Sequence, residues 1–131
     1  MSHATFIIPT PNALVAVPGR RNGYIQLAPR NRVTGFADLP PHVFEAGQAW
    51  ARQMEAMGAQ NVLLLMIAEV EPHKHLHIFP RWPQDKLKGI PLFESRENAA
   101  QPRWRDDVKS ALASWGQQHG VSIIAPCGVI H

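Results

Sequence analysis

The sequence predicts a single α+β domain, residues 1–131, with a mostly antiparallel sheet and its helices packed on one face. Three observations lead to this prediction. The chain has 131 residues, of which 45% are hydrophobic, which is enough for one core and short for two. Short apolar runs bounded by proline and glycine occur in neighbouring pairs, as antiparallel hairpins do. A stretch with helical spacing follows each pair, and the order hairpin, helix, hairpin, helix is typical of an α+β fold.

Residues 13–17 and 24–28 are expected to form the first hairpin. Both runs are mostly apolar and have the length of a strand. Pro18-Gly19 begins a polar turn between them, and Pro29 ends the second run. The two strands should therefore pair with each other.

A helix is expected next. Asp38 is a candidate N-cap, and Pro40-Pro41 suits a first helical turn. Gly58 is a suitable C-terminal stop. Five residues recur at helical spacing and are expected to face the core: Val43, Gly47, Trp50, Met54 and Met57.

The second hairpin is expected from residues 61–70 and 73–79, with Glu71-Pro72 as its turn. Residues 85–103 contain Gly89, Pro91 and Pro102 and are expected to be irregular.

The chain after this stretch should form a helix at residues 105–119, ended by Gly120, and a short strand at residues 121–125.

Composition limits the classes of partner. Lys and Arg exceed Asp and Glu by 13 to 10, for a formal charge of +3, which favours small anions over nucleic acid. A single cysteine, Cys127, excludes an internal disulfide, and no apolar run approaches the roughly 20 residues of a spanning helix. We therefore expect a cytoplasmic protein with no nucleic-acid or membrane partner. The basic residues include a local cluster of Arg20, Arg21, Arg30 and Arg32.

Three histidines at alternate positions form the most reactive part of the sequence. In a strand, successive side chains point to opposite faces, so His73, His75 and His77 should project from one face as a row of imidazoles. Imidazole serves as nucleophile, general acid or metal ligand near neutral pH. The site is therefore expected on this strand.

A metal site is one hypothesis for this row. Alternate residues of a strand are about 6.6 Å apart, so His73 and His77 would lie about 13 Å apart at the backbone. Two of the three histidines can share a metal, but a third ligand must come from elsewhere. No Cys-x-x-Cys or His-Glu-x-x-His pattern accompanies them, so a divalent metal is possible but not indicated, and no cofactor is required.

Nucleophilic catalysis is the second hypothesis. A neutral imidazole can attack phosphorus directly when its neighbours orient it and neutralise the oxyanions. The central His75 would attack, and an outer imidazole would donate to the phosphate oxygens. A row of merely solvated histidines is the third hypothesis.

The histidine run resembles the signature of the histidine triad family, His-φ-His-φ-His-φ-φ with φ apolar. The matching residues are His73-Lys74-His75-Leu76-His77-Ile78-Phe79, followed by Pro80-Arg81-Trp82 and Asp85. Upstream, residues 12–18, residues 23–29 and Asp38-Leu39-Pro40 resemble the family's order of two strands and a helix start. The resemblance covers about residues 10–85, and residues 86–131 match no family pattern.

The resemblance implies a nucleotidyl or phosphoryl hydrolase or transferase with a covalent histidine intermediate, which acts on a nucleoside phosphate as a two-fold homodimer. It assigns His75 as nucleophile, His73 as the residue that assists the leaving group and His77 as support for the nucleophile and phosphate. A catalytically weakened module that binds a nucleotide or phosphate is the alternative from the same resemblance.

The chain also departs from the family pattern. Tyr24 stands where the family has a histidine after glycine, and Ala16 stands at a position that commonly carries Asp or Asn. Lys74 occupies a position that is usually apolar. Since guanidinium holds phosphate with two parallel hydrogen bonds, the clustered arginines are candidates to replace lost phosphate contacts. The expected substrate-binding residues are Tyr24, Arg30, Arg32 and Arg81.

Overall fold

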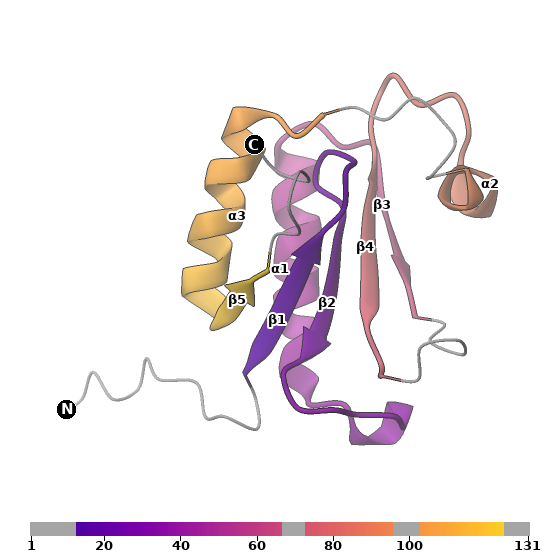
Figure 1. Cartoon of the computed structure of the whole chain (residues 1–131). Coiled ribbons are helices and arrows are strands. Elements are labelled where there is room, and N and C mark those ends of the chain that lie inside the picture. Colours follow the sequence, from indigo (N-terminus) through magenta and orange to yellow (C-terminus); the bar gives the residue numbers. More distant parts are fainter. Residues whose placement is uncertain (1–12, 67–72, 96–102, 125–131) are drawn as a thin grey trace.

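A five-stranded sheet forms the centre of the structure, a computed structural model that describes residues 13–66, 73–95 and 103–124. The strands lie in the order β3-β4-β2-β1-β5 (Figure 1). Their bounds are β1 Leu14–Pro18, β2 Ile25–Pro29, β3 Asn61–Leu65, β4 Leu76–Arg81 and β5 Val121–Ile123. The pairs β1–β2, β2–β4 and β3–β4 are antiparallel, and β5 runs parallel to β1. The predicted α+β class with a mostly antiparallel sheet is confirmed.

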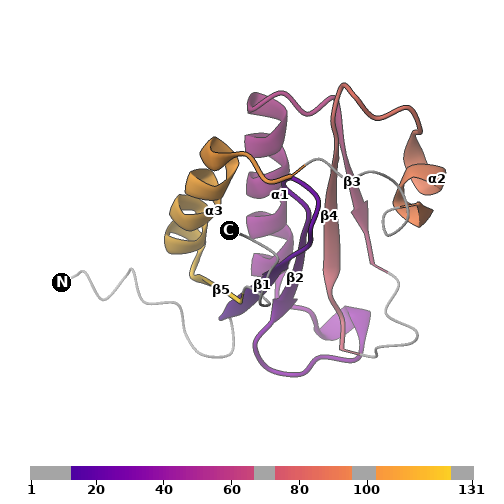
Figure 2. The same cartoon turned by 45° about the horizontal axis from the view of Figure 1, so that its top comes forward.

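Two long helices, α1 (Pro41–Ala56) and α3 (Asp106–His119), cover one face of the sheet, as Figures 1 and 2 show. The short helix α2 (Gly89–Glu94) lies on the opposite side, beside β3 and β4. Successive side chains of a strand point to opposite faces of the sheet, so each strand contributes to the packing on both faces. Leu76 and Ile78 of β4 belong to the core beneath α1, whereas Phe79 packs with Leu92 and Phe93 on the other face.

The prolines before α1 and the glycine after α3 mark the ends of these helices as predicted, but the predicted N-cap does not. Helix α1 begins at Pro41, with Pro40 as its N-cap, so the prediction of Asp38 as N-cap is wrong. Asp38 instead ends the short 3-10 helix η3 (Phe36–Asp38). Gly120 ends α3 in the left-handed conformation with φ of 68°, as expected for a glycine C-cap.

One other expectation about the chain is wrong, and a second falls on residues that the structure does not describe. Residues 85–103 were expected to be irregular, but they include α2. Six residues are short for a helix, and Gly89 and Pro91 obscured its pattern. The expected turn at Glu71-Pro72 lies outside the described residues. Within the described ranges, no helix is long and apolar enough to cross a membrane.

The turn between β1 and β2 receives hydrogen bonds from three tryptophans that are far apart in the sequence. A buried indole N–H needs an acceptor, and backbone carbonyls of the turn supply it here. The bonds run from Trp50 to the Gly23 carbonyl oxygen (2.9 Å), from Trp82 to that of Asn22 (2.8 Å) and from Trp104 to that of Gly19 (2.7 Å). Residues 19–24, called the anchored turn below, are therefore held by three separate segments of the chain.

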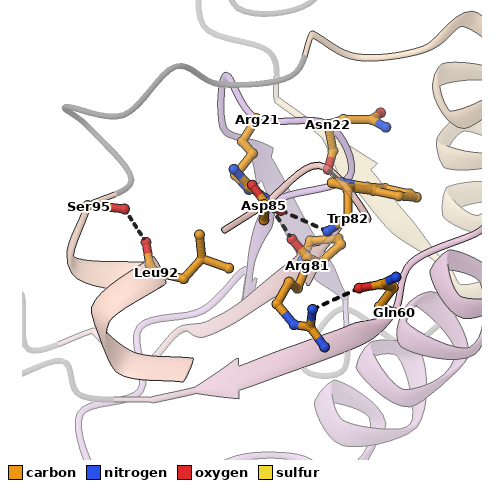
Figure 3. A network of polar contacts seen from close by, with 9 residues as sticks. Arg21, Asn22, Gln60, Arg81, Trp82, Asp85, Leu92 and Ser95 are labelled. Atoms are coloured by element: carbon orange, nitrogen blue, oxygen red, sulfur yellow. Dashed lines mark hydrogen bonds and ion pairs between the residues drawn. The ribbon is translucent and has the colours of Figure 1, made fainter. Parts of the chain in front are cut away.

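An ion pair fixes the same turn to the end of β4. Arg21, only 1% exposed, pairs with Asp85, and its guanidinium carbon lies 4.8 Å from the centre of the Phe79 ring. Asp85 also accepts a hydrogen bond from the Trp82 backbone N–H at 2.8 Å. Figure 3 shows Arg21 and Asp85 pointing toward each other, with Trp82 close by. The expectation that Arg21 is a candidate phosphate ligand is therefore wrong, because its charge is already paired inside the protein.

Candidate active site

The histidine run does not form one continuous strand. Strand β4 begins at Leu76, so His77 lies in the strand while His73 and His75 precede it. The β2–β4 ladder ends at the pair Leu27 and Leu76. The same register would place Pro29 opposite Lys74, and proline has no N–H with which to extend the ladder. The prediction of three histidines in a row on one strand face is therefore wrong, although two of them remain close.

His73 turns toward the loop that follows β2. The Val33 N–H donates to its Nδ1 at 2.9 Å, and its Nε2 lies 2.9 Å from the Pro29 carbonyl oxygen. A backbone N–H can only donate and a carbonyl can only accept, so the proton of this ring is on Nε2. Both ring nitrogens of His73 thus bind backbone groups, and the residue links the loop to the start of β4.

His75 has one nitrogen bound to backbone. Its Nδ1 lies 2.9 Å from the carbonyl oxygen of His73, which can only accept, so Nδ1 carries the proton. In a neutral ring Nε2 then carries a lone pair. His75 is half-buried, and among the described residues no hydrogen bond reaches its Nε2. In its neutral form the side chain therefore presents an oriented lone pair at the surface of the sheet.

His77 is more deeply placed, at 8% exposure. Its ring stands edge-on to that of His75, with centroids 4.8 Å apart. Its Nδ1 lies 2.7 Å from the hydroxyl of Tyr24, which in turn receives a longer contact of 3.4 Å from Gln26 Nε2. Tyr24 is 6% exposed, so its hydroxyl contacts a histidine of the site from within the protein.

Phe93 of α2 completes the aromatic surroundings of His77, and it was not among the residues predicted for the site. Its ring centroid is 5.1 Å from that of His77 and 5.4 Å from that of Phe79. Phe93 is only 5% exposed. The apolar pair Leu92-Phe93, inside a stretch otherwise rich in turn residues, was the one sequence signal of a segment that packs against the sheet.

The arginines expected to bind substrate lie in three different places. Arg30 follows β2 at the histidine end, but its side chain donates to Ser122 Oγ of β5 at 2.7 Å. Arg32 is exposed in the next loop. Arg81 ends β4, about 20 Å along the strand from His75, and donates to Gln60 Oε1 at 2.8 Å (Figure 3). The described structure thus brings Tyr24 to the histidines and places Arg81 at the far end of β4.

A pocket of about 330 Å³ lies at that far end, beside the anchored turn. Its lining includes Trp82, Arg103 and Arg105, and the Arg105 guanidinium carbon lies 5.2 Å from the centre of the Trp82 ring. Asp107 is hydrogen-bonded to Arg105, which raises the pKa of Arg105 and lowers that of Asp107. The length of β4 separates this pocket from His75, so the two belong to different surfaces.

A metal was an open alternative for the histidines. In the parts of the chain that the structure describes, no group of three His, Cys, Asp or Glu side chains is placed to hold a metal ion. His73 has both ring nitrogens on backbone groups, which leaves His75 and His77 as neighbouring imidazoles.

Comparison with solved structures gives a weak similarity in fold. No protein-family model matches the chain, and no curated protein matches it. Among solved structures, it is similar to the crystal structure of a zinc-bound histidine triad family protein from Mycobacterium smegmatis. That alignment has a TM-score of 0.39 and 18% sequence identity, and covers 78% of this chain and 69% of the other.

Proposed function

We propose that the chain is a histidine triad-like nucleotidyl or phosphoryl hydrolase or transferase that uses His75 as its nucleophile. One observation carries the proposal. The His73 carbonyl oxygen lies 2.9 Å from His75 Nδ1, which fixes the proton there and leaves the lone pair on Nε2. This is the protonation state that nucleophilic attack on phosphorus requires.

The proposed reaction has two steps. His75 Nε2 attacks phosphorus, a P–N bond forms, and the bond to the leaving group breaks as that group takes its electron pair and a proton from solvent. Water or another protic acceptor then attacks phosphorus and releases its proton to solvent, while the P–N bond breaks and its electron pair returns to Nε2. Through both steps the proton stays on His75 Nδ1, which donates it in a hydrogen bond to the His73 carbonyl oxygen, and the neighbouring His77 ring is near enough to contact the phosphate oxygens.

AMP release from adenosine phosphoramidate and from a dinucleoside polyphosphate tests this proposal. We expect release by the wild-type protein, none by His75→Ala, and a nucleotidylated histidine that mass spectrometry locates at residue 75 when the reaction is quenched in alkali. Release that survives in His75→Ala would overturn the proposal. Release without a trapped adduct would point to direct attack by water.

A catalytically weakened module that binds a nucleotide or phosphate is the second candidate, and the arginines favour it. Arg30 bonds Ser122 and Arg81 bonds Gln60, so neither is directed to the phosphate oxygens that a nucleophile at His75 would face. Calorimetry with AMP distinguishes the candidates. Saturable binding that His75→Ala leaves intact, without AMP release, would favour the binding module.

The proposed enzyme is a homodimer, as the family resemblance implies. Strand β3 lies at one edge of the sheet and carries Leu64, which is 52% exposed. An apolar edge strand presents unpaired backbone groups to a second strand. We therefore propose that two copies meet at this edge.

A further inference from the structure

We propose that Tyr24 is a positioning residue that holds His77 with its proton on Nε2, and that Gly19 belongs to the same device. The catalytic role given to Tyr24 rests on the proposed function, but the protonation of the His77 ring can be tested separately. It changes the role expected for Tyr24, from a substrate contact to a residue that acts through His77. The observations that carry it are a hydrogen bond, a close approach at Gly19 and the anchored turn.

Two hydrogen bonds indicate which atom donates the proton in the contact between Tyr24 and His77. Tyr24 and Gln26 are two residues apart at the start of β2, so they share a face, and Gln26 is paired with His77 in the ladder. Gln26 Nε2 donates toward the Tyr24 hydroxyl at 3.4 Å, while that hydroxyl lies 2.7 Å from His77 Nδ1. We assign the phenol proton to this contact, so that the hydroxyl accepts from the amide of Gln26 and donates to Nδ1 of His77. His77 then carries its proton on Nε2, as a neutral donor beside His75.

Packing leaves the Tyr24 ring little freedom. Its centroid lies 5.0 Å from that of Phe79 and 6.4 Å from that of Phe93, both in edge-on arrangements. The ring also folds back over Gly19, where an added Cβ would come within 2.4 Å of Tyr24 Cδ2. Real Cβ atoms essentially never approach so closely. Glycine at residue 19 is therefore required for the observed position of the ring.

The anchored turn supports both ends of this contact. The Gly19 N–H donates to the Tyr24 carbonyl oxygen at 2.8 Å, and the Tyr24 N–H donates to that of Arg21 at 3.0 Å. Trp104 holds the Gly19 carbonyl oxygen from outside. The anchored turn thus fixes the position of the Tyr24 ring, and the Tyr24 hydroxyl in turn fixes the orientation of the His77 imidazole.

The chemical consequence concerns charge. A phenol donates one proton and never becomes a cation, so Tyr24 orients His77 without adding a fourth ionisable imidazole to the site. Groups that orient metal-bound imidazoles are worth about 10–100-fold in activity, and we expect an effect of that size at His77. The loss in Tyr24→Phe should fall on kcat rather than on KM, because the hydroxyl reaches His77 and lies within the protein.

Proton-nitrogen correlation spectra of the histidine rings test the proposal on the whole chain. His77→Gln identifies the His77 signals. We expect the wild-type ring to show a protonated Nε2 and an unprotonated Nδ1. In Tyr24→Phe, which keeps the aromatic packing, the Nδ1 signal should shift and signals from both tautomers should average.

Gly19→Ala supplies a second test that leaves the hydroxyl in place. Its added methyl displaces the Tyr24 ring, so the His77 signals should change in the same direction. Gly35→Ala is the matched control, because its added methyl meets the exposed Asp38 side chain instead, at 3.1 Å. The control should leave the His77 signals unchanged.

The outcomes separate this inference from the proposed function. A wild-type ring protonated on Nδ1, or a spectrum indifferent to Tyr24→Phe, overturns the inference even if AMP is released. A spectrum that depends on Tyr24 and Gly19 supports it even if no AMP is released, in which case the proposed function alone fails. With activity present, kcat lowered about 10-fold or more in Tyr24→Phe also supports it.

Discussion

The ring of His73 reaches the carbonyl oxygen of Pro29, 44 residues earlier in the chain, with its Nε2 at 2.9 Å. Together with the bond from the Val33 N–H, this contact makes His73 a link between the loop after β2 and the segment that leads into β4. The His73 carbonyl also orients His75. His73 thus contributes to the site through backbone as well as through its ring.

Replacing His73 by alanine should lower the free energy of unfolding by about 1–2 kcal/mol, because the Val33 N–H and the Pro29 carbonyl each lose a partner in a half-buried setting. Urea denaturation measures the change. His75→Ala is the matched control and should cost less, since one ring nitrogen of His75 has no partner among the described residues. Equal losses in the two variants would contradict a linking role for the His73 ring.

The ion pair between Arg21 and Asp85 should be costly to break from one side. Their side chains are 2% and 7% exposed, so Arg21→Met leaves a buried carboxylate without its cation and should destabilise the fold by about 3–5 kcal/mol. The double variant Arg21→Met, Asp85→Asn should be destabilised by less than the sum of the two single variants. If the losses in the free energy of unfolding, measured by chemical denaturation, were strictly additive, Arg21 and Asp85 would not be coupled.

His119 should weaken the fold in acid. Burial lowers the pKa of His119 below its ordinary 6.5, and the charge of His42 lowers it further, while Glu45 raises it. The unfolded chain therefore takes up a proton at this residue before the folded chain does, and stability is lost as the pH falls below about 6.5. Above that pH both states are neutral at His119 and its contribution is constant.

Urea midpoints compared at about pH 8 and about pH 5 measure this effect. His119→Gln should reduce the difference between the two midpoints. Glu45→Gln should enlarge it, because the carboxylate that partly offsets the shift is gone. A difference that is insensitive to both variants would place the acid-sensitive group elsewhere.

The proposed dimer edge can be tested at Leu64. Leu64→Lys puts a charge on the exposed face of β3 and should convert the dimer to a monomer in light scattering at micromolar concentration. Ile124→Lys is the control, because Ile124 is similarly exposed, at 51%, and follows β5 at the other edge. A wild-type monomer, or a dimer that only Ile124→Lys disrupts, would contradict association through β3.

Local patterns were enough to predict most of the elements. The helical spacing of Val43, Trp50 and Met54 marked the buried face of α1, and Gly120 marked the end of α3, because both signals arise within a few residues. The pairing of the first two strands was also predictable, since a short turn joins them.

The site itself depended on contacts between distant residues. The start of β4 follows from its register with β2 and from Pro29, which the histidine spacing alone did not reveal. Arg21 and Arg30 looked equivalent in sequence, yet one pairs with Asp85 and the other bonds Ser122, 64 and 92 residues away. Tyr24 appeared as a departure from a family pattern, and its contact with His77 emerged only in three dimensions.

The anchored turn has a consequence for the order in which the molecule assembles. Its three indole donors belong to α1, to the end of β4 and to the segment before α3, so the turn reaches its final geometry only after all three segments have docked. Such long-range closure is slow and strongly cooperative. Loss of the Trp104 indole donor, in the segment before α3, should therefore loosen Gly19, and with it the orientation of His77. A segment outside the part of the chain that resembles a known family would then complete the chemistry of the histidines.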